Sequence, residues 1–213
     1  MSLPSASTLK IDGHIKNLGL TSTGRRDVLI HGQGIDQEPD VTDAGRNIHL
    51  EVGGSPLGGA AASQRLVLTN AVQWSLVFDG VGSWIRANLS GLDLGGLELD
   101  GVFSNCSFDL PVPTGPVRIV VDGVVRGLSL RRPAGVPVTV SIDGPARKLD
   151  LGSAILADGA PASAADMGVG YEVIIDGPVW NLTISERSSA ARRQSMGFSS
   201  ADQVLVISKP RSL

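Results

Sequence analysis

Six Asp-Gly pairs that each follow a strand-like apolar run divide this chain of 213 residues. Their aspartates are Asp12, Asp79, Asp100, Asp122, Asp143 and Asp176, separated by 67, 21, 22, 21 and 33 residues. The interval of 67 is close to three units of 22, and the interval of 33 contains an Ala/Gly/Pro-rich stretch typical of an inserted loop. A period of 21–22 residues predicts one small structural unit that is stacked several times.

Asp-Gly between β-forming runs usually indicates a two-residue hairpin, so this alternative has to be weighed first. Counted from each aspartate, the apolar positions are −3, −1 and +3, followed by +6 and +8, which have the opposite parity. A straight strand cannot place both sets on one face, because strand side chains alternate. The chain therefore has to bend between +3 and +6. This favours an all-β fold, a β-solenoid with coils of 21–22 residues, and a hairpin meander is the alternative.

The corners of the predicted coil are Asp-Gly and Pro-x-Gly, the latter in "PVPTGP" (111–116) and "RRPAGVP" (131–137). The inward positions of the units give the predicted core. It consists of Leu9, Ile11, Leu18, Leu20, Leu97, Leu99, Phe103, Cys106, Phe108, Ile119, Val121, Leu128, Leu130, Val140, Ile142, Leu149, Leu151, Val173, Ile175, Leu182 and Ile184.

We expect one solenoid domain over residues 1–186, with degenerate N-terminal coils and loops near 53–64 and 153–168. Residues 187–213 are predicted to be a polar linker followed by a terminal strand, "QVLVIS", over 203–208. Because the ends of a coil stack leave backbone groups unpaired, we expect this strand to cover an edge or to pair with a neighbouring subunit.

Composition excludes several classes of function. A net charge of −3 without a clustered basic face gives no reason to expect nucleic-acid binding. No apolar run is long enough for a membrane helix, and no secretory signal opens the sequence. We therefore expect a cytoplasmic protein, or an extracellular one if a leader has been removed.

Candidate chemistry is sparse, and we predict no enzyme activity, no cofactor and no metal. The six repeat aspartates are expected to cap their own turns, since the Gly-Gly-x-Gly-x-Asp spacing of calcium-binding β-rolls is missing. His14, His31 and His49 have no recurring carboxylate or cysteine partner and are expected at surfaces or corners. Cys106 stands where the other units carry leucine, which indicates a small core residue.

Tryptophans are the better candidates for a contact surface. Trp180 lies at position +4, which the alternation turns outward, and exposed tryptophan can stack on sugars or anchor a protein partner. We therefore name Trp74, Trp84 and Trp180 as a candidate contact surface, and scattered tryptophans packed under loops are the alternative.

The run "IVVDGVVRGLSLRRPAGVPVTVSIDGPARKLDLG" (119–152) resembles the bacterial families called putative adhesins or toast-rack domains, and the resemblance extends over about Leu99 to Ser185. A weaker similarity links the chain to bactofilins, cytoskeletal β-solenoids that polymerise end to end. The first resemblance implies a long solenoid-like body with contact roles and no catalytic residues to transfer.

The function predicted from these observations is a non-catalytic scaffold that associates with itself or docks a protein partner through a solenoid end or edge strand. A carbohydrate-binding or polysaccharide-acting solenoid is one alternative, and a bactofilin-like polymer is the other. A clustered row of Trp, Asp and Arg on one exposed face would favour the carbohydrate alternative.

Overall fold

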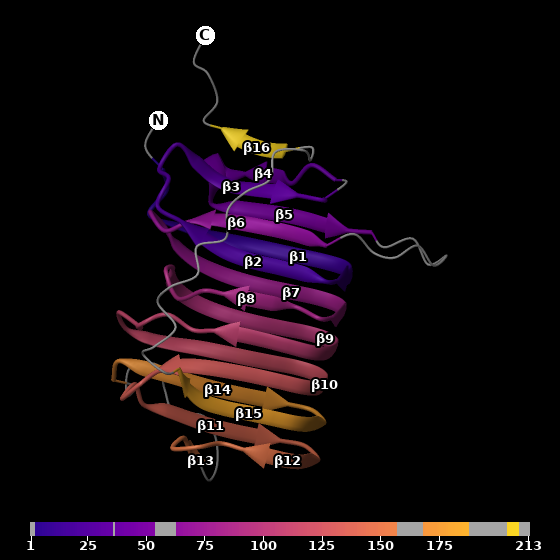
Figure 1. Ribbon diagram of the computed structural model, residues 1–213, viewed down its shortest axis with the longest axis vertical. Helices are drawn as coiled ribbons and strands as arrows, with labels where there is room; N and C mark the ends of the chain where they lie inside the picture. The colour runs from indigo at the N-terminus through magenta and orange to yellow at the C-terminus, as the bar shows by residue number, and fades with distance from the viewer. Residues whose placement is uncertain (1–2, 36, 54–62, 157–167, 188–203, 209–213) are drawn as a thin grey trace.

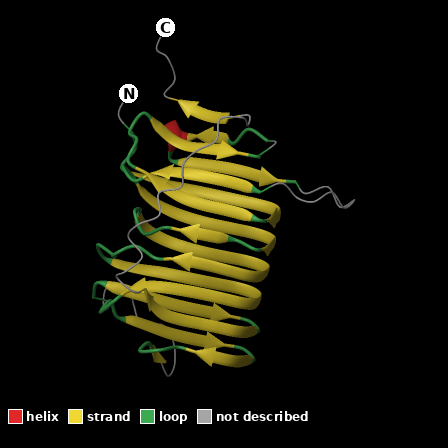
Figure 2. Ribbon diagram, viewed as in Figure 1, coloured by secondary structure: helices red, strands yellow, loops and turns green. Residues whose placement is uncertain are grey.

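The computed structural model describes residues 3–35, 37–53, 63–156 and 168–187, together with the backbone of 204–208. The fold is all-β, and its strands join into one 16-stranded sheet (Figures 1 and 2). The strands are β1 Ala6–Lys16, β2 Leu18–Thr23, β3 Val28–Gln33, β4 Asp40–Thr42, β5 Asn47–Val52, β6 Gln64–Thr69, β7 Gln73–Ser83, β8 Arg86–Asn88, β9 Asp93–Asp109, β10 Pro116–Pro133, β11 Val138–Asp143, β12 Ala146–Asp150, β13 Ile155–Leu156, β14 Gly170–Asp176, β15 Val179–Arg187 and β16 Val204–Ser208.

Repeat units stack side by side as parallel strands in matched register. Asp79 of β7 is opposite Asp100 of β9, and Asp100 is opposite Asp122 of β10. The sequence interval of 21–22 residues therefore equals the step from one strand to the next. Because Asp100-Gly101 lies within the continuous strand β9 and its neighbours are parallel, the hairpin alternative is wrong.

The glycine of each Asp-Gly pair occupies a conformation that only glycine accepts readily. Gly101 has φ +124°, and a Cβ added there would lie 2.1 Å from the carbonyl oxygen of Gly80. The same contact recurs one strand further, where a Cβ on Gly123 would lie 2.1 Å from the oxygen of Gly101. A positive φ carries little steric penalty only in a residue that has no Cβ. The glycines of the Asp-Gly repeat therefore form a column in which each backbone lies in close contact with the next.

A second bend lies four residues after each of these glycines, at position +5 of the unit. Its residues share a left-handed backbone, with φ between 54° and 59° for Asn17, Trp84, Asn105, Lys148 and Asn181, and 78° for Gly127. Asparagine is the residue other than glycine that best tolerates this region. The bend predicted between +3 and +6 lies here, and it turns the core positions on either side of it inward.

The spatial order of the units differs from their order in the chain. Asp12 of β1 is opposite Asp79 of β7, so no further unit is stacked between these two strands, although the interval of 67 residues is close to three repeat lengths. At the other end β14 lies between β10 and β11, and Asp176 is opposite both Asp122 and Asp143. The last repeat unit is therefore inserted between two earlier ones.

The core runs through the stack, and the predicted core residues are buried with three exceptions. Ile142 and Leu151 are half-buried and Leu149 is 38% exposed. All three belong to the unit at the end of the stack, and among the described residues no further unit is packed beyond it. Cys106 is 2% exposed, as predicted, and burial raises the pKa of its thiol to about 11.

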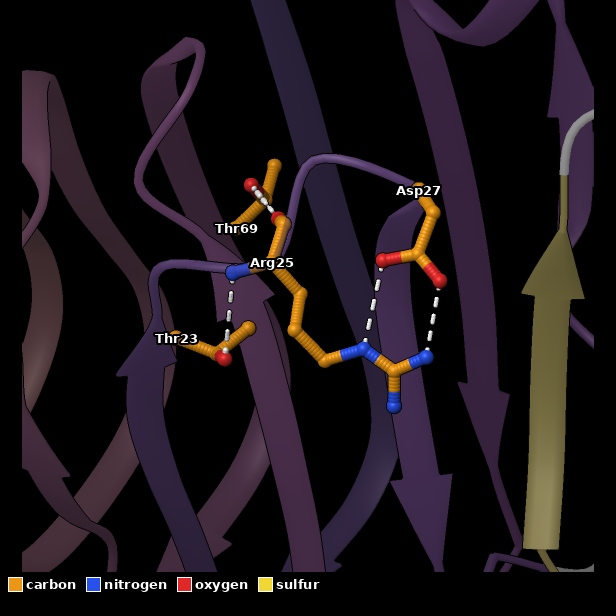
Figure 3. A network of polar contacts seen from close by, with 4 residues as sticks. All are labelled: Thr23, Arg25, Asp27 and Thr69. Atoms are coloured by element: carbon orange, nitrogen blue, oxygen red, sulfur yellow. Dashed lines mark hydrogen bonds and ion pairs between the residues drawn. The ribbon is translucent and has the colours of Figure 1, made fainter.

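The opposite end of the stack changes to antiparallel pairing. β3 is antiparallel to β6, β4 is antiparallel to β5, and β16 is antiparallel to β3 (Figure 1). Arg25 holds the turn from β2 into β3 by donating to the Asp27 carboxylate from Nε and Nη2, over 3.2 and 2.7 Å. Thr69 Oγ1 donates to the Arg25 carbonyl oxygen over 2.5 Å, which ties this turn to the end of β6 (Figure 3).

Two of the predicted segment boundaries need adjustment. The predicted loops at 53–64 and 153–168 fall largely on residues 54–62 and 157–167, which lie outside the described residues, as does most of the predicted linker, 188–203. Strand β6 begins at Gln64, and β13 lies within the second predicted loop. No helix in the described part of the chain is long and apolar enough to cross a membrane.

Candidate functional site

The end of the stack formed by residues 138–156, which we call the open end, carries an edge strand. In the described part of the chain, β12 pairs with β15 and with no other strand. The strand that precedes β12 in the chain, β11, pairs with β13 at Thr139 and Val140. This end lies at the bottom of Figure 1. An edge strand presents unpaired backbone N–H and C=O groups that can pair with another strand.

Apolar side chains that are buried elsewhere in the stack are exposed at the open end. Leu149 of β12 is in register with Leu182 of β15, which is in turn in register with Leu128 of β10. Leu182 and Leu128 are 0% and 1% exposed, whereas Leu149 is 38% exposed. Ile155 and Leu156 of β13 are 67% and 52% exposed. As far as the structure describes the chain, the open end thus combines an edge strand with core-type side chains in solvent.

The charges of the open end are balanced. Asp143, Arg147, Lys148 and Asp150 are all exposed, which gives two acids and two bases within eight residues. Lys148 stands at the left-handed bend, with φ 56°. A surface of this kind can place its bases opposite acids of a partner that carries the same pattern.

The aspartate column lies along the side of the stack. Asp12 Oδ2 is 2.6 Å from His49 Nε2, and Asp79 Oδ2 is 2.7 Å from Lys10 Nζ. These two carboxylates therefore contact the neighbouring strand, and Asp79 raises the pKa of Lys10. Turn capping stays a prediction for all six aspartates. In the part of the chain that the structure describes, no group of three or more His, Cys, Asp or Glu could hold a metal ion.

The three tryptophans do not form one surface. Trp74 is 0% exposed and its Nε1 donates to the Thr69 carbonyl oxygen over 2.7 Å, so it belongs to the core. Its position, −5 from Asp79, has the inward parity of −3 and −1, a signal that could have identified it. Trp84 is 48% exposed at a left-handed bend. Trp180 is on β15, separated from β7 by β9 and β10, or about 14 Å at ordinary strand spacing.

Trp180 is flanked by two arginines, an arrangement that sequence reasoning missed. Arg126 of β10 and Arg147 of β12 are both in register with Trp180, and the Arg126 guanidinium carbon is 5.8 Å from the centre of its ring. All three residues occupy position +4 of their units. This shared repeat position is the signal that could have found the row.

Two buried charges fix the inserted strands in place. Arg118 Nε of β10 donates to Glu172 Oε2 of β14 over 2.8 Å, and Glu172 is 2% exposed. Arg132 Nη1 of β10 is 3.0 Å from Glu186 Oε1 of β15, and the Arg132 side chain is 4% exposed. Because breaking a buried pair leaves an uncompensated charge, these pairs disfavour any other neighbour for β10.

A shallow pocket lies on the outer face of β2, β8, β9 and β10. Its polar lining includes Arg86, Asn88, Asp109 and Arg131. Arg131 Nε is 2.5 Å from Asp109 Oδ1, so these two lining residues are already paired with each other. We assign no ligand to it.

Comparison with known proteins identifies a solved structure with a similar fold. No protein-family model matches the chain, and no curated protein matches its sequence. The crystal structure of a putative cell adhesion protein from Clostridium sporogenes ATCC 15579 is similar, with a TM-score of 0.59 and 16% sequence identity. The similarity covers 86% of this chain and 93% of that one. At this identity the comparison establishes a shared fold.

Proposed function

We propose that the protein is a non-catalytic β-solenoid scaffold that acts by contact, with the open end as its docking site. The observation that carries the proposal is Leu149, a core-type residue that is 38% exposed on a strand for which the described residues provide one neighbour, β15. An incoming strand on β12 would satisfy free backbone groups and cover apolar surface in the same step.

The stacking pattern supports the solenoid part of the proposal. Units follow one another in parallel register at 21–22 residues, and each chain segment bends at Gly (+1) and again at +5. Short strands joined by such bends bring positions of both parities to a common interior, as the buried Leu97, Phe103 and Cys106 of one unit illustrate.

The fold relative supports the contact part of the proposal. The Clostridium sporogenes protein is described as a putative cell adhesion protein, and this chain shares its fold over most of both lengths. A fold alone does not define a function. The proposal therefore depends on the exposed edge and on the side chains of the open end.

Site-specific photocrosslinking in the cells from which the gene comes tests this function. A photoreactive residue replaces Leu149 in one variant and, as the control, Val112, which is 68% exposed in the connection between β9 and β10. We expect protein adducts from position 149 and none from position 112. Absence of adducts at 149, or equal labelling at both positions, would contradict a docking role for the open end.

Carbohydrate binding is the second candidate, and the Arg126–Trp180–Arg147 row favours it. Asp122, Asp176 and Asp143 lie four residues earlier in the same three units, so acids, bases and an aromatic ring gather along one edge. Aromatic rings stack on sugars, and arginine forks bind carboxylates.

A glycan array tests this second candidate with a Trp180→Ala variant and a Trp84→Ala control. If the row is a sugar site, we expect binding by the natural protein to disappear only in Trp180→Ala. Absence of glycan binding, or equal loss in both variants, would remove this candidate.

A further inference from the structure

We propose that the short side of the stack binds an acidic polysaccharide, one that carries sugar carboxylates, with the glycan chain lying across the strands. The short side consists of positions +2 to +4 of the repeat units, between the bend at the glycine (+1) and the bend at +5. The inference rests on the carbohydrate candidate of the proposed function, because it uses the row at Trp180. It adds the charge class of the glycan, its direction on the stack and a second row of contacts.

A row of apolar side chains lies on the short side at position +2. Val81 of β7 is in register with Val102 of β9, which is in register with Val124 of β10. Val81 and Val102 are 49% and 50% exposed, and Val124 is half-buried. Pro178 and Pro145 hold this position in the next two units, so the row extends over about 20 Å at ordinary strand spacing. The C–H groups on the face of a sugar ring can pack on such a strip.

Bases and an aromatic ring border this strip at position +4. Arg126 and Arg147 are exposed and lie on either side of Trp180, two strand spacings or about 10 Å apart. The Arg126 guanidinium carbon is 5.8 Å from the centre of the Trp180 ring, a contact that holds this arginine in place. A guanidinium group binds a carboxylate through two parallel hydrogen bonds. The row therefore offers two carboxylate sites along the stack.

Acids border the strip on its other side, at position 0. The exposed ones are Asp100, Asp122, Asp143 and Asp176. Four residues separate each aspartate from position +4, so the two rows are at most about 14 Å apart. A ligand between them has to donate hydrogen bonds on one edge and carry negative charge on the other. A sugar acid does both, because its C2 and C3 hydroxyls and its C5 carboxylate project from opposite edges of the ring.

Two other extended ligands fit the short side less well. An extended peptide binds by adding a strand to a free sheet edge. Here β9 is paired with both β7 and β10, and β10 is paired on its other side with β14 and β15. A nucleic acid carries a phosphate at every step, and position +4 is serine at Ser83 and Ser104, where no arginine would neutralise it. The surface therefore favours a glycan with carboxylates near Arg126 and Arg147.

Calorimetric titration of the full chain with acidic oligosaccharides tests the charge class. The probes are short oligomers of galacturonate, of mannuronate and of hyaluronan, each compared with its methyl ester, which is neutral and keeps the ring hydroxyls. We expect at least one acidic probe to bind and its ester to bind about tenfold more weakly, because charged hydrogen bonds are lost. Added salt should weaken the binding of the acid. Oligo-glutamate, an acidic peptide, should not bind.

The outcomes separate this inference from the carbohydrate candidate on which it rests. If an acid and its ester bind equally and Trp180→Ala abolishes both, the carbohydrate site stands and its acidic specificity is wrong. If the glycan array shows only neutral ligands and none of the acidic probes binds, the result is the same. Tighter binding of oligo-glutamate than of every acidic probe would identify a peptide surface and overturn the inference.

Arginine variants locate the carboxylate sites. Arg126→Gln and Arg147→Gln should each weaken binding of the acidic probe about tenfold, since each removes one charged contact. The matched control is Arg65→Gln, an exposed position on β6, which should bind the probe as the natural protein does. Equal effects of all three variants would show a response to net charge alone and would overturn the assigned site.

A valine variant tests whether the glycan lies along the apolar row. Val102→Asp adds a negative charge to the strip and should abolish binding of the acidic probe. The control is Val112→Asp, because Val112 is 68% exposed in the connection between β9 and β10. Far-ultraviolet circular dichroism checks that each variant is folded. If binding withstands Val102→Asp and both arginine variants, the glycan binds elsewhere and the inference is wrong.

Discussion

Gly101 lies against the backbone of Gly80 so closely that a Cβ at residue 101 would be 2.1 Å from the Gly80 carbonyl oxygen. Gly101→Ala must therefore separate two strands or strain a backbone with φ +124°. We expect it to lower the free energy of unfolding by at least about 2 kcal/mol. Urea denaturation measures this, and Gly115→Ala is the matched control, because nothing lies within 4 Å of its Cβ position. Equal effects would show that the glycine column is not under constraint.

Asn105 occupies the left-handed bend at position +5, with φ 54°. Asn105→Val should destabilise the protein by about 1–2 kcal/mol, because a β-branched residue is strained in this region. Asn105→Gly should change stability little, since glycine adopts this conformation without strain. Thermal unfolding of both variants checks the prediction. If valine were tolerated as well as glycine, the bend would not depend on local backbone conformation.

Leu182 and Leu149 share position +6 on neighbouring strands but differ in burial. Leu182→Ala should cost about 3 kcal/mol, because a fully buried leucine leaves a cavity. Leu149→Ala should cost less than about 1 kcal/mol in the monomer, since its side chain already contacts solvent. Urea denaturation of both variants at the same low protein concentration makes this comparison. A large loss from Leu149→Ala there would mean that the open end is packed within one chain.

Cys106 gives the protein a defined alkaline sensitivity. Burial raises its pKa from 9.0 to about 11, so between these values the folded chain keeps a proton that the unfolded chain releases. Stability contributed by the neutral thiol is thus complete below pH 9 and falls as the pH rises to 11, by about 2 kcal/mol. Lys10 and Tyr171, whose pKa values are also raised, act in the same direction at higher pH.

The measurement is the free energy of unfolding at pH 8 and pH 10.5 for the natural chain and for Cys106→Ala. Alanine removes the thiol and leaves the other titrating groups in place. The natural chain should lose more stability than the variant over this interval. A pH dependence that is identical in the two proteins would refute the assigned role of the thiol.

The strands, bends and inward positions of one repeat unit could be predicted from the sequence, because they depend on interactions between residues close together in the chain. Alternation of apolar residues, the change of parity after +3 and the conformational demand of Asp-Gly all act within one unit. They predicted the all-β class, the bend that lies at +5 and most of the core, including Cys106 at a leucine position. Trp74 was named as a contact candidate although its position has the inward parity, because the amphipathic character of tryptophan was weighed and its place in the repeat was not.

The arrangement of the units could not be predicted, because units with nearly the same pattern offer nearly the same partners. β10 can form equivalent parallel ladders with β11 or with β14, and the sequence order favours β11. The tertiary structure places β14 there, with Glu172 buried against Arg118 and Glu186 against the buried Arg132. That choice moves Leu149 from an interior position to the end of the stack. Its exposure results from the absence of a further unit beyond β12 in the described structure, a global fact that no local pattern contains.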